Sequence, residues 1–290
     1  MKSFQDLKHY FPFLIFFTCF WAGCTEPVNV PGLDAQANQL VVDALFTTEN
    51  RVHIIYLSRS TAITNANFPE ETRATVYIID DQNNRIDFIE QNPGSYFSPT
   101  VAAQQGRTYT LHIITNDGKR YVTPPQVLPN APAPIKSLVA VDGSGVDDDG
   151  NAVDFAQVEV TFEDPADEEN FYYWYWQSNT TEQFGIPDLT WGSAAENDEL
   201  FNGNELVFTL DEEFNRSLDQ YVKVYQAEVS QDTYTFLDNL KRQANSGQVP
   251  ILPPGQPLVG NLTNQDNPNE LVLGYFVLAN VTSATVKLTP

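Results

Sequence analysis

Cys24 is placed for covalent chemistry, because it follows two small residues and a short apolar run. Signal peptidase II requires small residues directly before the cysteine that receives the lipid, and Ala22 and Gly23 supply them. Two lysines precede the apolar run at 11–20, which is too short to span a bilayer. This order predicts a lipoprotein signal peptide over 1–23 and a lipidated Cys24 that takes up palmitate. A buried apolar amino-terminal helix is the alternative.

The predicted mature chain is strongly acidic. The whole sequence has a net charge of −23, and removal of 1–23 takes away two lysines and one aspartate, which changes it to −24. Such a surface repels nucleic acid and anionic headgroups, so we expect no nucleic-acid partner. Thr25 follows the cysteine where an aspartate would retain the protein in the inner membrane. We therefore expect a lipid anchor in the outer membrane, with the protein exposed at the cell surface.

The elements that follow predict a β-sandwich. Residues 24–37 hold two prolines and a glycine without periodicity, so we expect a tether there. Apolar and polar residues then alternate over 38–125, with turn signals at 80–84, 92–94 and 116–119. Short strands at this spacing are typical of a sandwich. The expected strands are 39–46, 52–58, 72–80, 85–90, 108–115 and 120–123.

A proline-rich segment at 126–134 predicts a linker between two domains, because proline stiffens the chain and removes strand hydrogen bonds. A second, β-rich domain then covers 135–290. The whole chain is expected to be mainly β, with a transthyretin- or immunoglobulin-like sandwich followed by a fibronectin-III-like one. The strands expected after the linker are 135–141, 158–162, 171–177, 205–210, 219–228, 270–278 and 284–288, with 158–162 paired to 171–177.

One amphipathic helix is predicted near 231–245, since Tyr234, Leu237 and Leu240 fall on one stripe. We expect it to cover a sheet, although docking of a partner on it stays open. The aspartate-rich loop at 142–150 resembles a calcium loop. The EF-hand order, however, lacks two of the required carboxylates there, so we expect a solvated loop.

The strand at 171–177 is aromatic on both faces, which leaves two interpretations open. Tyr172, Trp174 and Trp176 share one face, and together with Trp191 they are candidate residues for stacking on sugar rings or peptide side chains. Alternatively, the strand lies in the centre of a sandwich with both faces covered. We expect the second arrangement.

The sequence holds few groups suited to catalysis. After removal of 1–23, His53 and His112 are the remaining histidines, and we expect both at surface or rim positions of strands. Neither has a neighbouring ligand at metal-binding spacing, and the sequence contains no nucleophile-elbow or phosphate-binding glycine motif. We expect no enzyme, cofactor or metal site. A glycosidase-like pair of carboxylates stays open.

Several short motifs follow the predicted lipidation site in a fixed order, which is the order they have in one protein family. They lie at 40–44, 74–81, 93–96, 106–111, 162–165, 232–237 and 273–276. Over the whole mature chain, this ordered set resembles the Bacteroidota outer-membrane lipoproteins of the domain of unknown function 4249 family. The resemblance implies an accessory or substrate-capturing role beside the β-barrel of a TonB-dependent transporter. The alternative is a stand-alone module that binds carbohydrate or peptide.

Overall fold

The computed structural model describes residues 38–61, 68–146, 152–179, 193–246 and 258–288. All of them belong to one unit, Gln36–Pro290. Its strands are β1 (Leu40–Thr47), β2 (Ile54–Arg59), β3 (Thr75–Asp80), β4 (Arg85–Asn92), β5 (Ser95–Phe97), β6 (Thr108–Ile114), β7 (Arg120–Val122), β8 (Gln126–Val127), β9 (Ile135–Val146), β10 (Ala152–Glu163), β11 (Phe171–Ser178), β12 (Ser193–Asn197), β13 (Glu205–Thr209), β14 (Phe214–Asn215), β15 (Tyr221–Glu228), β16 (Thr263–Asn264) and β17 (Leu273–Lys287). Its helices are the 3-10 turn η4 (Asp198–Leu200) and α2 (Gln231–Ser246).

The prediction of a mainly β chain is confirmed. The larger sheet runs in the order β12-β11-β15-β17-β1-β2-β5-β4-β3-β6-β7-β16, with β8 paired to β6. The smaller sheet consists of β13, β10, β14 and β9, and β10 pairs with each of the other three. The three turn signals of the amino-terminal half each join neighbouring antiparallel strands, namely β3 to β4, β4 to β5 and β6 to β7.

Strand β17 connects the two halves of the sequence. Its first part pairs in parallel with β1, and its second part pairs antiparallel with β15, so the two strands predicted at 270–278 and 284–288 are one. Gly274 permits this pairing, because its φ is +76° and an added Cβ would lie 2.0 Å from the carbonyl oxygen of Val42. The residues from 135–290 that complete the core of the first half are Leu262, Val272, Phe276 and Leu278. The linker predicted at 126–134 therefore does not separate two independent cores.

The prediction that 158–162 pairs with 171–177 is wrong. The first segment lies in β10 of the smaller sheet, whereas the second lies in β11 of the larger one. The connection at 164–170 crosses from one layer to the other. Val158 and Val160 of β10 instead pack face to face against Val224 of β15, since burial of two apolar sheet faces outweighs a hairpin between neighbours in sequence.

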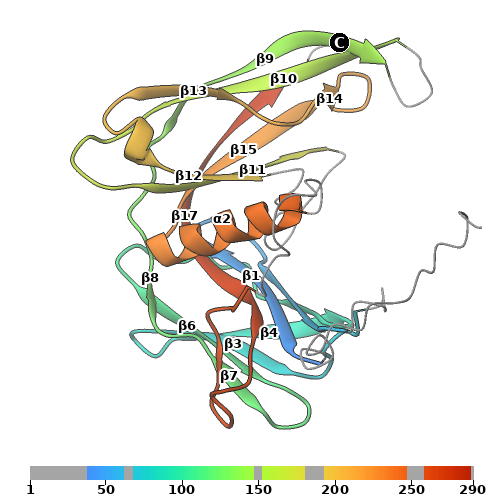
Figure 1. Ribbon diagram of the computed structural model, residues 1–290, viewed down its shortest axis with the longest axis vertical. Coiled ribbons are helices and arrows are strands. Elements are labelled where there is room, and N and C mark those ends of the chain that lie inside the picture. The colour runs from blue at the N-terminus through green and yellow to red at the C-terminus, as the bar shows by residue number, and fades with distance from the viewer. Residues whose placement is uncertain (1–37, 62–67, 147–151, 180–192, 247–257, 289–290) are drawn as a thin grey trace, which may run out of the picture. The chain divides into compact units, whose positions relative to one another are not determined.

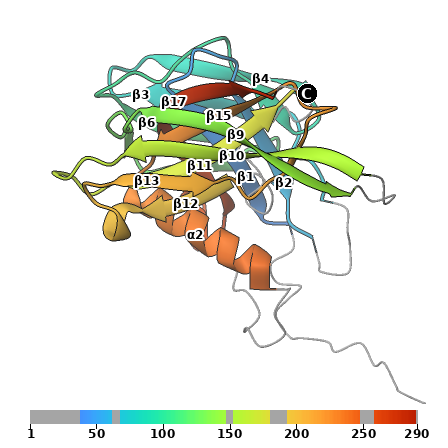
Figure 2. The same cartoon turned by 90° about the horizontal axis from the view of Figure 1, so that it is seen from above.

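Helix α2 covers the larger sheet, as the sequence indicates. Figure 1 shows β11 and β15 between the smaller sheet on one side and α2 on the other, and Figure 2 shows the same layers from above. Leu237 is fully buried on this face, and the Phe236 ring stacks on Tyr275 with centroids 4.3 Å apart. The Ser230 hydroxyl accepts a hydrogen bond from the Thr233 amide at 3.3 Å and caps the helix.

Candidate functional site

The aromatic strand β11 lies in the core, as expected. Tyr172, Trp174 and Trp176 are 0%, 1% and 4% exposed, because the smaller sheet covers their face of the strand. Residues on the opposite face, including Tyr173, pack in the cluster under α2. No open stacking surface exists at these three residues. The other two candidate positions, Cys24 and Trp191, lie outside the described residues.

Buried hydrogen bonds hold these aromatic side chains in place. The Tyr172 hydroxyl donates to Asp164 Oδ1 at 2.7 Å, and Trp174 Nε1 donates to Gln226 Oε1 at 2.9 Å. Gln226 in turn donates to a backbone carbonyl at 2.7 Å. The Tyr172 hydroxyl and the Trp174 indole nitrogen are thereby satisfied, which is the condition for burying these two polar atoms without a large penalty.

The expected rim position of His53 is wrong. The ring is fully buried, contacts the Val101 carbonyl oxygen through Nε2 at 2.9 Å and meets the Phe46 ring edge-on. Burial, and then the nearby Arg51, lowers the pKa of His53 to about 4, so the ring is neutral at pH 7. His112 is half-buried and stacks on Tyr77 with ring centroids 4.9 Å apart.

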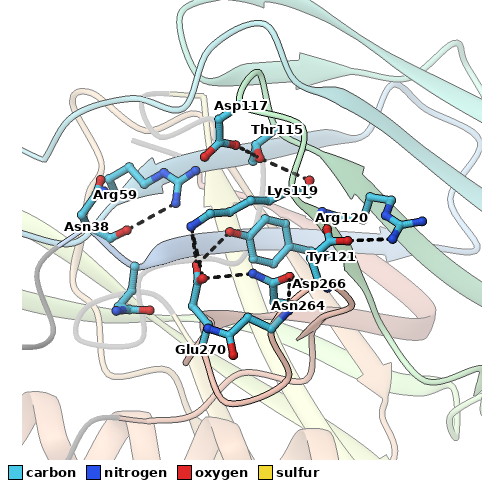
Figure 3. A network of polar contacts seen from close by, with 12 residues as sticks. Asn38, Arg59, Thr115, Asp117, Lys119, Arg120, Tyr121, Asn264, Asp266 and Glu270 are labelled. Atoms are coloured by element: carbon cyan, nitrogen blue, oxygen red, sulfur yellow. Dashed lines mark hydrogen bonds and ion pairs between the residues drawn. The ribbon is translucent and has the colours of Figure 1, made fainter.

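A dense polar network joins segments far apart in the sequence (Figure 3). It brings together the end of β2, the β6–β7 hairpin and the segment around β16. We call this network the polar clasp. Its members are Arg59, Thr115, Asp117, Lys119, Arg120, Tyr121, Asn264, Asp266, Glu270 and the carbonyl of Asn38.

Glu270 is the centre of the polar clasp. Its carboxylate accepts from Lys119 Nζ at 3.1 Å, from the Tyr121 hydroxyl at 3.0 Å and from Asn264 Nδ2 at 3.0 Å. The Glu270 side chain is 14% exposed, so water screens these charges only in part. Lys119 and Tyr121 belong to the β6–β7 hairpin region, so a single carboxylate fastens the segment after β16 to that hairpin.

A second contact fixes the register of the same segment. Strand β16 pairs with β7, and Asp266 then accepts from the backbone amide of Arg120 at 2.9 Å and from its Nη2 at 2.6 Å. Asn264 Oδ1 accepts from the Asp266 amide at 2.8 Å, which closes the turn that follows the strand.

Arg59 connects the polar clasp to the first described residue. Its Nη1 donates to the Asn38 carbonyl at 3.3 Å, while its Nε donates to Glu71 Oε2 at 2.5 Å. The side chains of Arg59 and Glu71 are only 10% and 11% exposed. A buried guanidinium with a paired carboxylate therefore holds the carbonyl of Asn38, where the described part of the chain begins.

The electrostatics of the polar clasp favour binding between segments over proton transfer. Burial raises the pKa of Tyr121 to about 12, so its hydroxyl stays protonated and donates at neutral pH. The Thr115 hydroxyl, which donates to Asp117 at 2.5 Å, lowers the pKa of that carboxyl. Sequence reasoning missed this network, since Lys119 and Glu270 are 151 residues apart and no local pattern relates them.

We expect Glu270→Gln to lower the free energy of unfolding by about 1–2 kcal/mol, because it removes the charge from hydrogen bonds with Lys119 and Tyr121. Urea denaturation measures the change. Glu205→Gln is the matched control, because it removes a carboxylate that pairs with Lys136 at 3.4 Å. Both of these side chains are about half exposed, so the control should lower the free energy of unfolding by less than about 0.5 kcal/mol. Equal losses in the two variants would contradict a stabilising role for the polar clasp.

A second polar group lies at the end of the sandwich where 164–170 crosses between the sheets. We call Asp164, Asn170, Asp198 and Glu228 the buried acid cluster, because each is at most 5% exposed. Asp164 Oδ2 accepts from the Gly203 amide at 2.9 Å, and Asp198 Oδ2 accepts from the Asn170 amide at 3.0 Å. Burial raises the pKa of Glu228 to about 7.

Within the part of the chain that the structure describes, no group of three or more His, Cys, Asp or Glu side chains is arranged to hold a metal ion. A separate search of these residues for a long apolar helix that could cross a membrane finds none. No curated protein matches the sequence. A family model, described as Domain of unknown function (DUF4249), matches residues 25–285, which is most of the chain. The protein therefore belongs to the DUF4249 family.

Proposed function

We propose that this protein is an outer-membrane, surface-exposed lipoprotein of the Bacteroidota, and that it serves as a non-enzymatic accessory or substrate-capturing subunit of a TonB-dependent nutrient transporter. The observation that supports this proposal is the polar clasp. It braces the point at which the predicted tether joins the body, through the Arg59 contact with Asn38.

The length of the predicted tether supports the same arrangement. Fourteen residues at 24–37, fully extended at about 3.3–3.6 Å each, reach about 50 Å. The lipid on Cys24 would therefore keep the body within reach of a transporter in the same membrane. The negative charge of the mature chain opposes adsorption to anionic headgroups and leaves the body free to bind a protein partner.

The proposed body consists of a transthyretin- or immunoglobulin-like sandwich and a fibronectin-III-like one that share β17. Packed sheets of this kind offer a rigid surface to a binding partner. The polar clasp contacts Asn38, the residue that follows the predicted tether. The stand-alone binding module is the weaker alternative, because Tyr172, Trp174 and Trp176 are in the core and do not offer their rings to a ligand.

We expect Cys24→Ser to release the protein from membranes, since each buried CH₂ of an acyl chain contributes about 0.8 kcal/mol to anchoring. Labelled palmitate incorporation and fractionation of cells that express each form measure the effect. Wild type should incorporate the label and pellet with outer membranes, whereas the serine variant should do neither. A serine variant that still pellets, with no label in wild type, would refute the lipid anchor.

Affinity purification tests the function. The tagged wild type is extracted from its native outer membrane in mild detergent, beside a tagged control lipoprotein of similar abundance and the soluble Cys24→Ser form. We expect a TonB-dependent transporter to be enriched with wild type over both controls. Recovery of the protein with no transporter above the control lipoprotein would reject this function and favour the stand-alone module.

A further inference from the structure

Glu228 carries a carboxylate oxygen for which the structure provides no donor. The side chain stands at the end of β15 and is 5% exposed. Oε1 accepts from the Phe171 amide at 2.9 Å. Oε2 is buried and has no hydrogen-bond partner within the described residues. An ionised carboxylate with one oxygen left unsatisfied in the core is costly, so this group needs a donor or a proton.

The side-chain amide of Asn170, next to Glu228, also has an oxygen without a hydrogen-bond donor. Asn170 is 5% exposed, and its amide lies beside the Glu228 carboxyl. Asn170 Oδ1 is also buried without a partner among the residues that the structure describes. As placed, the Asn170 amide approaches the Glu228 carboxyl as a donor, while one oxygen of each side chain has no partner. A proton on the Glu228 carboxyl satisfies both, because the acid O–H is a donor that Asn170 Oδ1 can accept in one orientation of the amide.

The surrounding charges favour the protonated acid. Burial is the main cause that raises the pKa of Glu228; the hydrogen bonds from Phe171 and Asn170 lower it in part, and repulsion by Glu168 and Asp164 of the connection at 164–170 raises it further. Asp198 of η4 lies in the same cluster and holds the Asn170 amide, and Tyr172 of β11 faces the group as a neutral hydroxyl bound to Asp164. In the described part of the chain no salt bridge reaches Glu228, so no cation compensates a second negative charge there.

We propose that Glu228 retains its proton in the folded protein well above the pH at which a free glutamate loses it, and that this proton holds closed the end of the sandwich where 164–170 passes from one sheet to the other. Loss of the proton leaves a carboxylate against Asp164, Glu168 and Asp198, and the amides of Asn170 and Phe171 then separate from Asp198 and Glu228. Burial raises the pKa of Glu228 to about 7, which agrees with this assignment and places the change in the physiological range.

Two measurements on the full mature protein test the proposal. The first follows the side-chain carboxyl carbon of Glu228 by NMR against pH, and we expect its titration near pH 7 in wild type. The second follows hydrogen exchange of the Asn170 and Phe171 amides, corrected for intrinsic exchange. Between pH 5 and pH 7, protection in wild type should fall by about tenfold per pH unit and then level off, because the open form releases the proton.

Glu228→Gln should remove this pH dependence, since the amide is neutral at every pH and can still accept from Phe171. Glu196→Gln is the control, because Glu196 is exposed on the neighbouring strand β12, and it should keep the wild-type slope. A Glu228 titration at the usual value near pH 4.3 would overturn the proposal, and this readout needs no variant. So would a saturable shift of the Glu228 and Asp198 signals with calcium chloride, which would assign Oε2 to a cation.

Discussion

Replacement of Trp174 by alanine should lower the free energy of unfolding by about 3–5 kcal/mol, which is the cost of removing a large aromatic side chain from a closed core. Trp174 is 1% exposed and packs against Phe208, with ring centroids 4.8 Å apart. Its removal also leaves Gln226 Oε1 without the 2.9 Å hydrogen bond from the indole.

Thermal and urea unfolding of the two forms measure this effect. The control is Leu200→Ala, because Leu200 is a large apolar residue that is 94% exposed and should change stability by less than about 0.5 kcal/mol. Trp176→Ala, at a side chain 4% exposed, should behave like Trp174→Ala. Unchanged stability of the tryptophan variants, with loss of binding to a sugar or peptide, would restore the stacking interpretation of this strand.

The contribution of Glu228 to the free energy of unfolding should fall by about 3 kcal/mol as the pH rises from about 4.5 to about 7, and the difference between wild type and Glu228→Gln isolates it from the opposite contribution of buried His53. In the unfolded chain a glutamate releases its proton near pH 4.3, whereas burial raises the pKa of Glu228 to about 7 in the folded protein. Between these values the folded state binds one more proton than the unfolded state. Its stabilisation is therefore complete at the acidic end and is lost as the pH approaches 7.

Urea denaturation at pH 5, 6, 7 and 8 measures this dependence. We expect the stability of Glu228→Gln to rise relative to wild type over this range and to exceed it at pH 8, because the variant replaces a buried charge by a neutral amide. His53 titrates alike in both forms and cancels in the difference. Glu196→Gln should leave the profile unchanged. Parallel pH profiles of wild type and Glu228→Gln would assign the pH dependence to other groups and contradict the raised pKa of Glu228.

Local patterns were sufficient for the identity of most elements. Alternation predicted β1 and β3, and the stripe of Tyr234, Leu237 and Leu240 predicted α2, because each of these elements buries one regular face. The same reasoning predicted that 171–177 is a core strand, since aromatic residues on both faces require cover on both sides. The same reasoning gave a wrong position for His53, because a single polar residue in an alternating segment does not indicate whether another layer of the structure will cover it.

The sequence by itself determined the class of the chain, the positions of its helix and most of its longer strands, its acidic charge and its place in the DUF4249 family. It missed short strands such as β12 and β16, and β9 continues to Val146 into the segment expected to be a solvated loop. Only the tertiary structure decided which strands are partners. It merged two predicted strands into β17, placed β10 and β11 in different sheets, and joined Lys119 to Glu270 across 151 residues. The reason is that a strand's period records which of its faces is buried, whereas pairing and long-range polar contacts depend on how whole layers pack. The environment of Glu228 follows from the same packing, because its burial and its acidic neighbours exist only once the two sheets have closed.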